Sequence, residues 1–418
     1  MRQYKLDTIG QIYSYTTNSN WSPVYRIQAN LFEAVDPSCL QKALDDLRER
    51  FPYFFVAMKK GFCSNYFEEN DEQLKVMPDG ENKLTYFNRE EFNHFCFRIL
   101  YGEKHVAIEI FHVLTDGHGA SVFLFTLLHR YLELKHGIPK IAQALSGLIY
   151  SLEGKPSEEE TENSYKENAG NTTTNLKEEK NFKLGGTPIQ KKIVTLGIVD
   201  TKPLLDKARH LGVTVTTFLT TVLIETLIGM QNKEGKTKKR PVTVSTAANI
   251  RNVFASKTLR NYTATRNLGV AREHFNDRFE DKCKEIGKQL KEFTQKDFMQ
   301  GVTTAYVKAL ENPIIKYMPL TLKEKIVSAI YTRECDDCTC VGISNLGDIK
   351  LPEEMAPFID RMYFVLGDEK TIRNNCSAIS FNGKTYIAFT RSIEETALED
   401  MYFERLNALG LEYRLESL

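Results

Sequence analysis

The sequence lacks an excess of charge of either sign. It has 55 Lys and Arg residues and 55 Asp and Glu residues among its 418 residues, so its formal net charge is zero. Proteins that bind nucleic acids or other polyanions usually carry a basic excess. The composition therefore predicts no nucleic-acid partner.

Three further features are also missing. The first twenty residues contain no apolar core of a secretory signal peptide. The most apolar long stretch, residues 212–230, contains Glu225 and several threonines, which predicts a buried helix and no membrane span. The eight cysteines are scattered along the chain, as is usual for reduced thiols. We therefore expect a cytoplasmic protein.

The polar segment 151–186 divides the chain. Aliphatic and aromatic residues are scarce in it, and Glu, Lys, Asn and Thr dominate. Such a composition buries too little apolar surface to offset the entropy lost on ordering. A chain of this length usually forms more than one core. We predict an N-terminal subdomain at 1–150, an exposed and flexible linker at 151–186, and a C-terminal subdomain at 187–418.

Both halves mix the periodicities of strands and helices, which predicts an α/β (α+β) fold. Strands are predicted in the first half at 24–35, 53–60, 92–102 and 104–112, and in the second half at 191–199, 240–250, 338–347, 361–367, 375–383 and 384–392. Helices are predicted at 36–51, 201–212, 215–231 and from about Glu394 to 409.

One strand ends at a histidine that can act in catalysis. In the stretch HVAIEIFH, alternation places His112 on the same face as Val106, Ile108 and Ile110. Glycines then permit a corner before a predicted helix, whose positive N-terminus would favour a neutral imidazole. A neutral imidazole is the form that a general base needs. Asp116, just before Gly117, either caps that helix or pairs with a distant arginine.

Spacing alone favours structural roles for these residues. A histidine beside apolar residues is more often a buried structural group, and an Asp-Gly pair is more often a turn or a cap. The nearby histidines do not have the H-E-x-x-H spacing of a zinc site, and Cys335, Cys338 and Cys340 lack a clear fourth ligand. We therefore predict no metal site.

Other catalytic motifs are incomplete. The sequence GKTKK at 235–239 follows Gly229, which is one residue too far away for a phosphate-binding P-loop. GHGASV lacks the third glycine of a dinucleotide-binding fingerprint, and no G-x-S-x-G nucleophile motif occurs. The basic run around 233–240 is most simply a solvated loop, with attraction of substrate phosphates as an alternative.

Residues 112–117 spell H-x-x-x-D-G, which resembles the active-site motif of the chloramphenicol acetyltransferase-like superfamily. The start of the chain, through VYRIQANLFEAVDPSCLQKAL, resembles alcohol acetyltransferase-like members. VSTAANIRNVF with RNYTATRNLG, and VGISNLGDI, resemble segments of the superfamily's second half. Many condensation domains of peptide synthetases have two consecutive histidines, whereas here Phe111 precedes His112. The similarity is therefore greater to stand-alone acyltransferases.

The resemblance implies two similar subdomains, each a mixed sheet with helices, that meet at an active-site tunnel. It implies that His112 is the general base for acyl transfer from acyl-coenzyme A, a donor substrate, to a hydroxyl or amine, with no permanently bound cofactor and no covalent intermediate. Ser344 and Asn345 are candidate oxyanion contacts. The alternatives are a condensation enzyme that uses an acyl carrier protein, and a catalytically silent ligand-binding homologue.

The resemblance also bears on Asp116. The superfamily's aspartate points away from the substrate toward an arginine. Arg251, in the sequence NIRN, matches that arginine best, and Arg26, in VYRIQ, is the second choice. We predict that such a pair ties the active-site loop to the rest of the protein and thereby positions His112.

Overall fold

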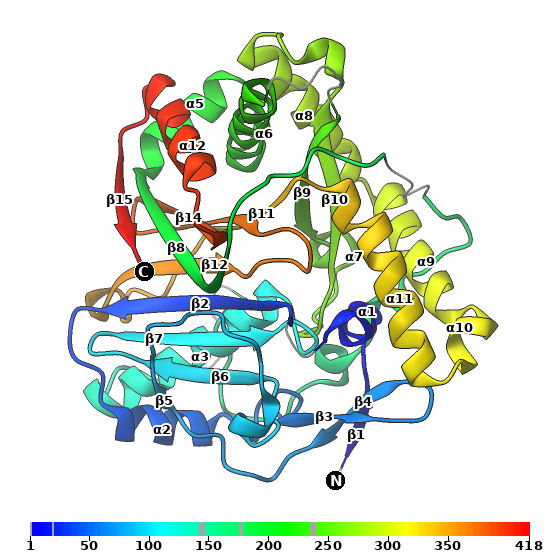
Figure 1. Ribbon diagram of the computed structural model, residues 1–418. Helices are drawn as coiled ribbons and strands as arrows, with labels where there is room; N and C mark the ends of the chain where they lie inside the picture. The colour runs from blue at the N-terminus through cyan, green and yellow to red at the C-terminus, as the bar shows by residue number, and fades with distance from the viewer. Residues whose placement is uncertain (1, 19–20, 142–146, 175–178, 235–239) are drawn as a thin grey trace.

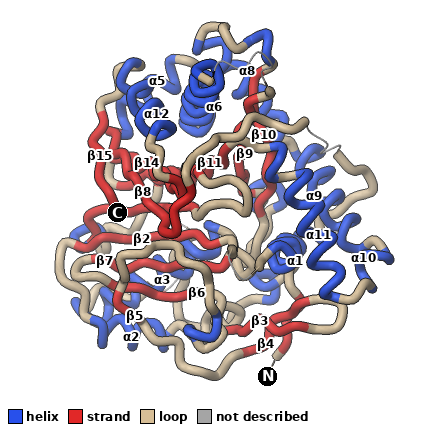
Figure 2. The backbone as a smooth tube through the Cα atoms, viewed as in Figure 1, coloured by secondary structure: helices blue, strands red, loops and turns tan. Residues whose placement is uncertain are grey.

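The protein is described from a computed structural model that covers residues 2–418, except 19–20, 142–146, 175–178 and 235–239. The described residues form three β-sheets with helices packed around them (Figure 1, Figure 2). The two larger sheets each mix parallel and antiparallel neighbours. The predicted mixed α/β fold is confirmed.

The first large sheet belongs mainly to the N-terminal half. Its five strands lie in the order β12 (Ile359–Leu366), β2 (Val24–Leu31), β7 (His105–Phe111), β6 (Phe97–Tyr101) and β5 (Met77–Pro78). Helix α3 (Gly117–His136) packs on β2 and β7, and α2 (Pro37–Asp46) packs on α3. Strand β7 is buried on both faces, because its Glu109 side chain pairs with arginines on the face opposite Ile108. This burial fixes the position of the C-terminal end of β7, where His112 follows directly.

The second large sheet belongs to the C-terminal half. Its seven strands lie in the order β10 (Thr263–Val270), β9 (Val242–Asn249), β11 (Val341–Asp348), β13 (Asn374–Phe381), β14 (Lys384–Ile393), β8 (Pro188–Asp200) and β15 (Tyr413–Ser417). The helices packed with it are α5 (Thr201–His210), α6 (Val215–Lys233), α8 (Phe279–Phe293) and α12 (Ala397–Ala408). Their apolar side chains and those of the sheet form one core.

The two halves exchange structure. Strand β12 comes from the C-terminal half of the chain, but it pairs antiparallel with β2 over seven register positions from Ile359 to Leu366. Val194 and Leu196 of β8 also join the core of the N-terminal half. The N-terminal sheet therefore contains a strand from beyond residue 187, so a cut in the chain at 151–186 does not divide the sheets cleanly.

A third sheet lies at the lower right of the molecule, near the N-terminus, and a group of helices lies above it (Figure 1). The antiparallel strands are β1 (Gln3–Lys5), β4 (Asn65–Glu69) and β3 (Val56–Lys60). Helix α1 (Thr8–Thr16) packs against α9 (Lys296–Glu311) and α11 (Leu320–Glu334). The remaining short elements are α4 (Ser164–Glu167), α7 (Arg251–Phe254), α10 (Pro313–Tyr317), η1 (Arg89–Phe92), η2 (Glu158–Thr161), η3 (Arg272–His274), η4 (Asp336–Cys338) and η5 (Ala356–Phe358).

The expectation that the whole of segment 151–186 is exposed is wrong. Glu160 is buried and its carboxylate accepts two hydrogen bonds from Arg50, at 2.7 and 2.9 Å. Tyr165 is completely buried, and its ring lies edge-on to that of Tyr262 at 5.1 Å. Phe182 joins the core of the C-terminal half. A few well-placed side chains anchor this segment, although its average composition is polar.

Residues 153–155 and 157–159 of this segment are exposed, and we expect a glutamate-specific protease to cleave there first. The two fragments should then co-elute in gel filtration without denaturant, because β12 of the second fragment pairs with β2 of the first. A denatured sample of the same digest provides the control, since its fragments should separate. Separation under native conditions would contradict a sheet shared between the halves.

Candidate active site

The predicted corner between a strand and a helix is formed around His112. This residue directly follows β7, and its backbone N–H donates to the Pro23 carbonyl at 2.8 Å. Four residues later Asp116 caps α3, with Oδ1 accepting the backbone N–H groups of His118 at 3.1 Å and Gly119 at 3.2 Å. The cap satisfies N–H groups that a helix start otherwise leaves unpaired. It also fixes the direction in which the chain leaves the corner.

Two glycines let the C-terminal half approach this corner closely. A Cβ on Gly119 would lie 2.2 Å from the carbonyl oxygen of Leu259. Because this oxygen belongs to the backbone, no side-chain rotation can relieve the clash. A Cβ on Gly117 would lie 2.8 Å from the end of the Leu346 side chain. The corner therefore packs directly on the second half of the chain, and at Gly119 glycine is the residue that fits.

Asp116 and Arg251 form a buried ion pair. Arg251 Nη1 lies 2.8 Å from Asp116 Oδ2, and the two side chains are 4% and 1% exposed. The same Oδ2 accepts the backbone N–H of Tyr262 at 2.7 Å, and Arg251 Nε donates to the Thr258 carbonyl at 2.7 Å. Burial alone would raise the pKa of the Asp116 carboxyl, but Arg251 outweighs it and lowers that pKa. Asp116 therefore both caps α3 and pairs with an arginine.

Arg26 has different partners. Its guanidinium lies 2.6 Å from Asp79 and 2.9 Å from Glu109, inside a buried network that also includes Arg98. Glu109 and His112 lie on opposite faces of β7 by alternation, so Arg26 faces away from Asp116. The second choice of partner for Asp116 is therefore wrong, and Arg251 takes that place.

The His112 ring is held by an asparagine from the second half. Its Nδ1 lies 3.0 Å from Asn261 Oδ1, and Asn261 Nδ2 donates to Asp7 Oδ2 at 3.1 Å. Because Asn261 Nδ2 donates to a carboxylate, its oxygen must face the imidazole, and Nδ1 must carry the proton. The Nε2 lone pair is then available as a base. The chain Asp7–Asn261–His112 fixes this tautomer without placing a charge directly on the ring.

The surroundings of His112 favour the neutral form. Its ring packs between those of Tyr13 and Tyr25, with centroids at 4.7 and 4.8 Å. Burial lowers the pKa of His112 below 6.5, while the Asp116 carboxylate and the hydrogen bond with Asn261 oppose that change. Burial among aromatic rings therefore favours the neutral form of the ring.

His112 lines a cavity of about 290 Å³ between the two halves. The N-terminal half contributes Tyr13, Tyr25 and His118, and the C-terminal half contributes residues of β9, β10 and β11. Burial, followed by the positive charge of Arg251, lowers the pKa of His118 to about 4. His118 is therefore neutral at physiological pH, but no partner in the described part of the chain orients its ring as Asn261 orients that of His112.

Ser344 and Asn345 both reach this cavity. The Asn345 amide is engaged locally, since Nδ2 donates to Thr216 at 3.1 Å and Oδ1 accepts from the Gly347 backbone at 2.9 Å. The Ser344 hydroxyl has no hydrogen-bond partner among the residues that the structure describes. Ser344 is therefore better placed than Asn345 to bind an oxyanion.

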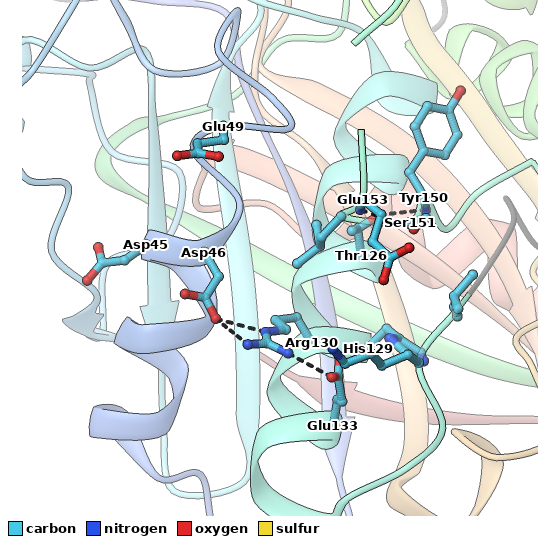
Figure 3. Close-up of a pocket in the computed structure, with 13 residues that line it drawn as sticks. Asp45, Asp46, Glu49, Thr126, His129, Arg130, Glu133, Tyr150, Ser151 and Glu153 are labelled. Carbon is cyan, nitrogen blue, oxygen red and sulfur yellow. Dashed lines mark hydrogen bonds and ion pairs between the residues drawn. The ribbon is translucent and has the colours of Figure 1, made fainter. Parts of the chain in front are cut away.

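Another hollow, of about 420 Å³, lies between α2 and α3 on the N-terminal half (Figure 3). Its Arg130 is held by Asp46 and Glu133, each at 2.7 Å. His129 Nε2 is buried without a partner in the described structure, and acidic, basic and hydroxyl side chains all line the hollow around it. Within the described residues, no hydrogen-bonded chain like that of His112 joins a base in this hollow to a partner, so we assign no reaction to it.

The remaining motifs add no second site. Within the described residues, no group of three or more His, Cys, Asp or Glu side chains is arranged to hold a metal ion, and none of Cys335, Cys338 and Cys340 forms a disulfide. The sequence GKTKK lies outside the described residues. No single described helix is long and apolar enough to cross a membrane, although α5 and α6 pass that test as a pair bent by 85°.

Comparisons with known proteins support the fold. No protein-family model and no curated protein matches the sequence. Among solved structures, TRI101 from F. sporotrichioides in complex with coenzyme A and T-2 is 10% identical, with a TM-score of 0.62, and 99% of this chain and 100% of that chain are covered. TRI3 trichothecene 15-O-acetyltransferase from Fusarium sporotrichioides is 11% identical, with 97% and 94% covered and a TM-score of 0.57.

A third solved structure is the epimerization domain from the third module of tyrocidine synthetase B. It is 12% identical, with 98% of this chain and 96% of that chain covered and a TM-score of 0.60. These likenesses extend over almost the whole chain at low sequence identity, so they concern the fold. The chain therefore has the fold shared by chloramphenicol acetyltransferase-like acyltransferases and condensation domains, as the H-x-x-x-D-G motif predicted.

Proposed function

We propose that this protein is an acyltransferase that moves an acyl group from acyl-coenzyme A to a hydroxyl or amine acceptor. The observation that carries the proposal is a neutral imidazole in a cavity between the halves, with Nδ1 engaged by Asn261 and Nε2 left as the base. The fold of a protein crystallised with coenzyme A and of an acetyltransferase supports this class of donor and reaction.

The proposed reaction begins when His112 Nε2 takes the proton from the acceptor hydroxyl or amine. The acceptor attacks the thioester carbonyl carbon, and the carbonyl oxygen becomes an oxyanion near Ser344 and the backbone N–H of Gly117. When the carbon–sulfur bond breaks, the departing thiolate takes the proton back from His112. The histidine ends neutral and the acyl group never bonds to the protein. A general base of this kind contributes roughly 10²- to 10⁴-fold to the rate.

A donor screen tests the proposal. A panel of acyl-coenzyme A esters is incubated with the protein, with and without alcohols and amines, and free thiol is followed with a thiol-reactive dye. We expect thiol release that depends on the acceptor. Transfer only from an acyl group on a carrier protein would indicate the condensation-type alternative, which the likeness to an epimerization domain keeps open. Binding of acyl-coenzyme A without any transfer would indicate a silent ligand-binding homologue.

The acidity of His112 predicts the pH dependence of the reaction. Only the neutral ring accepts a proton, and burial lowers its pKa below 6.5. With an uncharged alcohol as the acceptor, we therefore expect the acid limb of kcat/KM to be centred below pH 6.5, because kcat/KM reports the ionisation of the free enzyme. Initial rates in buffers of constant ionic strength measure this. An acid limb centred above pH 6.5 would contradict the assignment of a neutral His112 as the base.

A further inference from the structure

A second cavity, of about 150 Å³, adjoins the His112 cavity. It extends between α1, α9, α11 and the loop that follows β12. The six residues that line both cavities are Tyr13, Ser245, Thr263, Thr265, Gly342 and Glu369. A ligand with its reacting group at His112 can therefore continue past Tyr13 into this second space, which we call the acidic cavity.

Two carboxylates line the acidic cavity without a cation between them. Asp336 is 2% exposed and its Oδ2 accepts a hydrogen bond from the Thr371 hydroxyl at 3.1 Å. Glu369 Oε2 accepts a hydrogen bond from the Tyr331 hydroxyl at 3.4 Å. Within the described structure, no Lys, Arg or His side chain forms an ion pair with either carboxylate. Both groups therefore face the cavity with uncharged hydrogen-bond partners.

The lysines of this region are committed to other groups. Lys183 Nζ donates to the backbone carbonyls of Asp336 and Thr339, and Lys370 Nζ donates to the Ser328 hydroxyl at 2.6 Å. Neither lysine is among the residues that line the acidic cavity. The positive charge that would balance Asp336 and Glu369 is therefore left for a ligand to supply.

Without a counterion, both carboxyl groups have pKa values above their usual range. Burial, and then the charges of Asp336 and Asp368, raise the pKa of Glu369 to about 8. Burial also raises the pKa of Asp336 to about 6, although Thr371 and Lys183 oppose the change. A cation placed between two such groups favours their ionised forms, and buried charges are stabilised when they are paired in this way.

Three tyrosines also line the acidic cavity. Tyr13, Tyr306 and Tyr331 belong to α1, α9 and α11, and all three line the acidic cavity. Aromatic faces attract ammonium groups, particularly where water is excluded. Tyr13 also packs against His112 at 4.7 Å, so it connects the candidate base with the acidic cavity. Carboxylates and tyrosine rings together form a lining suited to an organic cation.

We infer that the acceptor carries two groups: a nucleophilic hydroxyl or amine that reacts at His112, and a separate ammonium group that binds between Asp336 and Glu369. The inference rests on the proposed function and names its acceptor class, amino alcohols and diamines. The ammonium group keeps its protons throughout, while the other group loses one proton to His112 and gains the acyl group. The phosphates of coenzyme A are repelled by the two carboxylates, so the donor enters from another side of the His112 cavity.

A matched pair of acceptors tests the inference. Aminobutanol, with its amino group at the end opposite the hydroxyl, and pentanol have the same length and differ in the ammonium group. With the acyl-coenzyme A that releases most thiol, we expect kcat/KM of the wild type to be at least about tenfold higher for aminobutanol, as for a close charge pair. Mass spectrometry of the product identifies the ester. In Glu369→Gln and Asp336→Asn, the ratio of the two kcat/KM values should fall toward one.

Two control variants remove the same charge elsewhere. Asp337→Asn changes the residue that follows Asp336. The Asp337 carboxylate pairs with Lys180 at 2.9 Å, and Asp337 does not line the cavity. Glu394→Gln removes an exposed carboxylate. Both should keep the wild-type ratio. A wild-type ratio near one, or equal losses in the control variants, would overturn the acidic cavity as the determinant of acceptor choice while leaving acyl transfer in place.

Direct binding separates the two proposals. Isothermal titration calorimetry of aminobutanol and pentanol into the full-length protein, at constant ionic strength, requires no catalysis. We expect heat of binding from aminobutanol with the wild type, and at least about a tenfold weaker affinity with Glu369→Gln. Binding of this kind without thiol release from any donor would overturn the proposed function and keep the cation site. Thiol release with pentanol but no selective aminobutanol binding would overturn the cation site alone.

Discussion

His112→Ala is expected to lower kcat by about 10²- to 10⁴-fold, the contribution of a general base. The reason is that Nε2 of this ring is the basic atom that the Asp7–Asn261 chain leaves free at the cavity. Purified wild type and variant are compared by acceptor-dependent thiol release with an established donor and acceptor. Circular dichroism and thermal melting, measured on the same samples, report whether the fold is intact.

His210→Ala is the matched control, because it removes an exposed imidazole at the end of α5. It should retain wild-type turnover and melting temperature. Unchanged turnover in His112→Ala would contradict the proposed mechanism. A large fall in the melting temperature of His112→Ala would instead show that the ring serves mainly to hold Tyr13 and Tyr25 in place, and His112→Gln, which keeps a polar partner for Asn261, then separates packing from proton transfer.

The local part of this site could be predicted from the sequence. Alternation in HVAIEIFH placed His112 on a definite strand face, and the following glycines indicated a corner, because both features depend on neighbouring residues. The pairing of Asp116 with Arg251 required the family resemblance, since 135 residues separate the two. Asn261 and Asp7 were missed. Asn261 lies 149 residues from His112 along the chain, and Asp7 lies 254 residues from Asn261. No local pattern in the sequence identifies such distant partners.

The fold shows the same division between local and long-range information. The strand at 361–367 was predicted, but its place beside β2 of the other half was not, because strand partners are chosen by packing. Helices α9 and α11 were not assigned, and their half-buried faces mix polar and apolar residues. Helix α8 was missed although its buried Phe279, Cys283, Ile286 and Phe293 have helical spacing, so there a usable signal was overlooked.

Asp116→Asn is expected to destabilise the protein by about 3–5 kcal/mol, because it leaves the buried Arg251 guanidinium without its carboxylate. Arg251→Met should cost a similar amount for the opposite reason. The double variant should cost less than the sum, since residues of one buried pair are coupled by about 0.5–3 kcal/mol. Chemical denaturation of the four proteins measures this cycle. A second cycle with Arg26→Met should be additive, because Arg26 pairs with Asp79 and Glu109.

The same cycle shows whether Asp116 positions His112 or takes part in the chemistry. If Asp116 positions His112, the Asp116→Asn protein should lose turnover and stability together, and Arg251→Met should reproduce both losses. The Asp116 charge also raises the pKa of His112 against the effect of burial, so Asp116→Asn should move the acid limb of kcat/KM to still lower pH. If the effects of Asp116→Asn and Arg251→Met were additive while Asp116 and Arg26 were coupled, Arg26 would be the partner of Asp116 and the Asp116–Arg251 assignment would be wrong. Collapsed turnover in an Asp116→Asn protein of unchanged stability would make Asp116 a direct participant in the reaction.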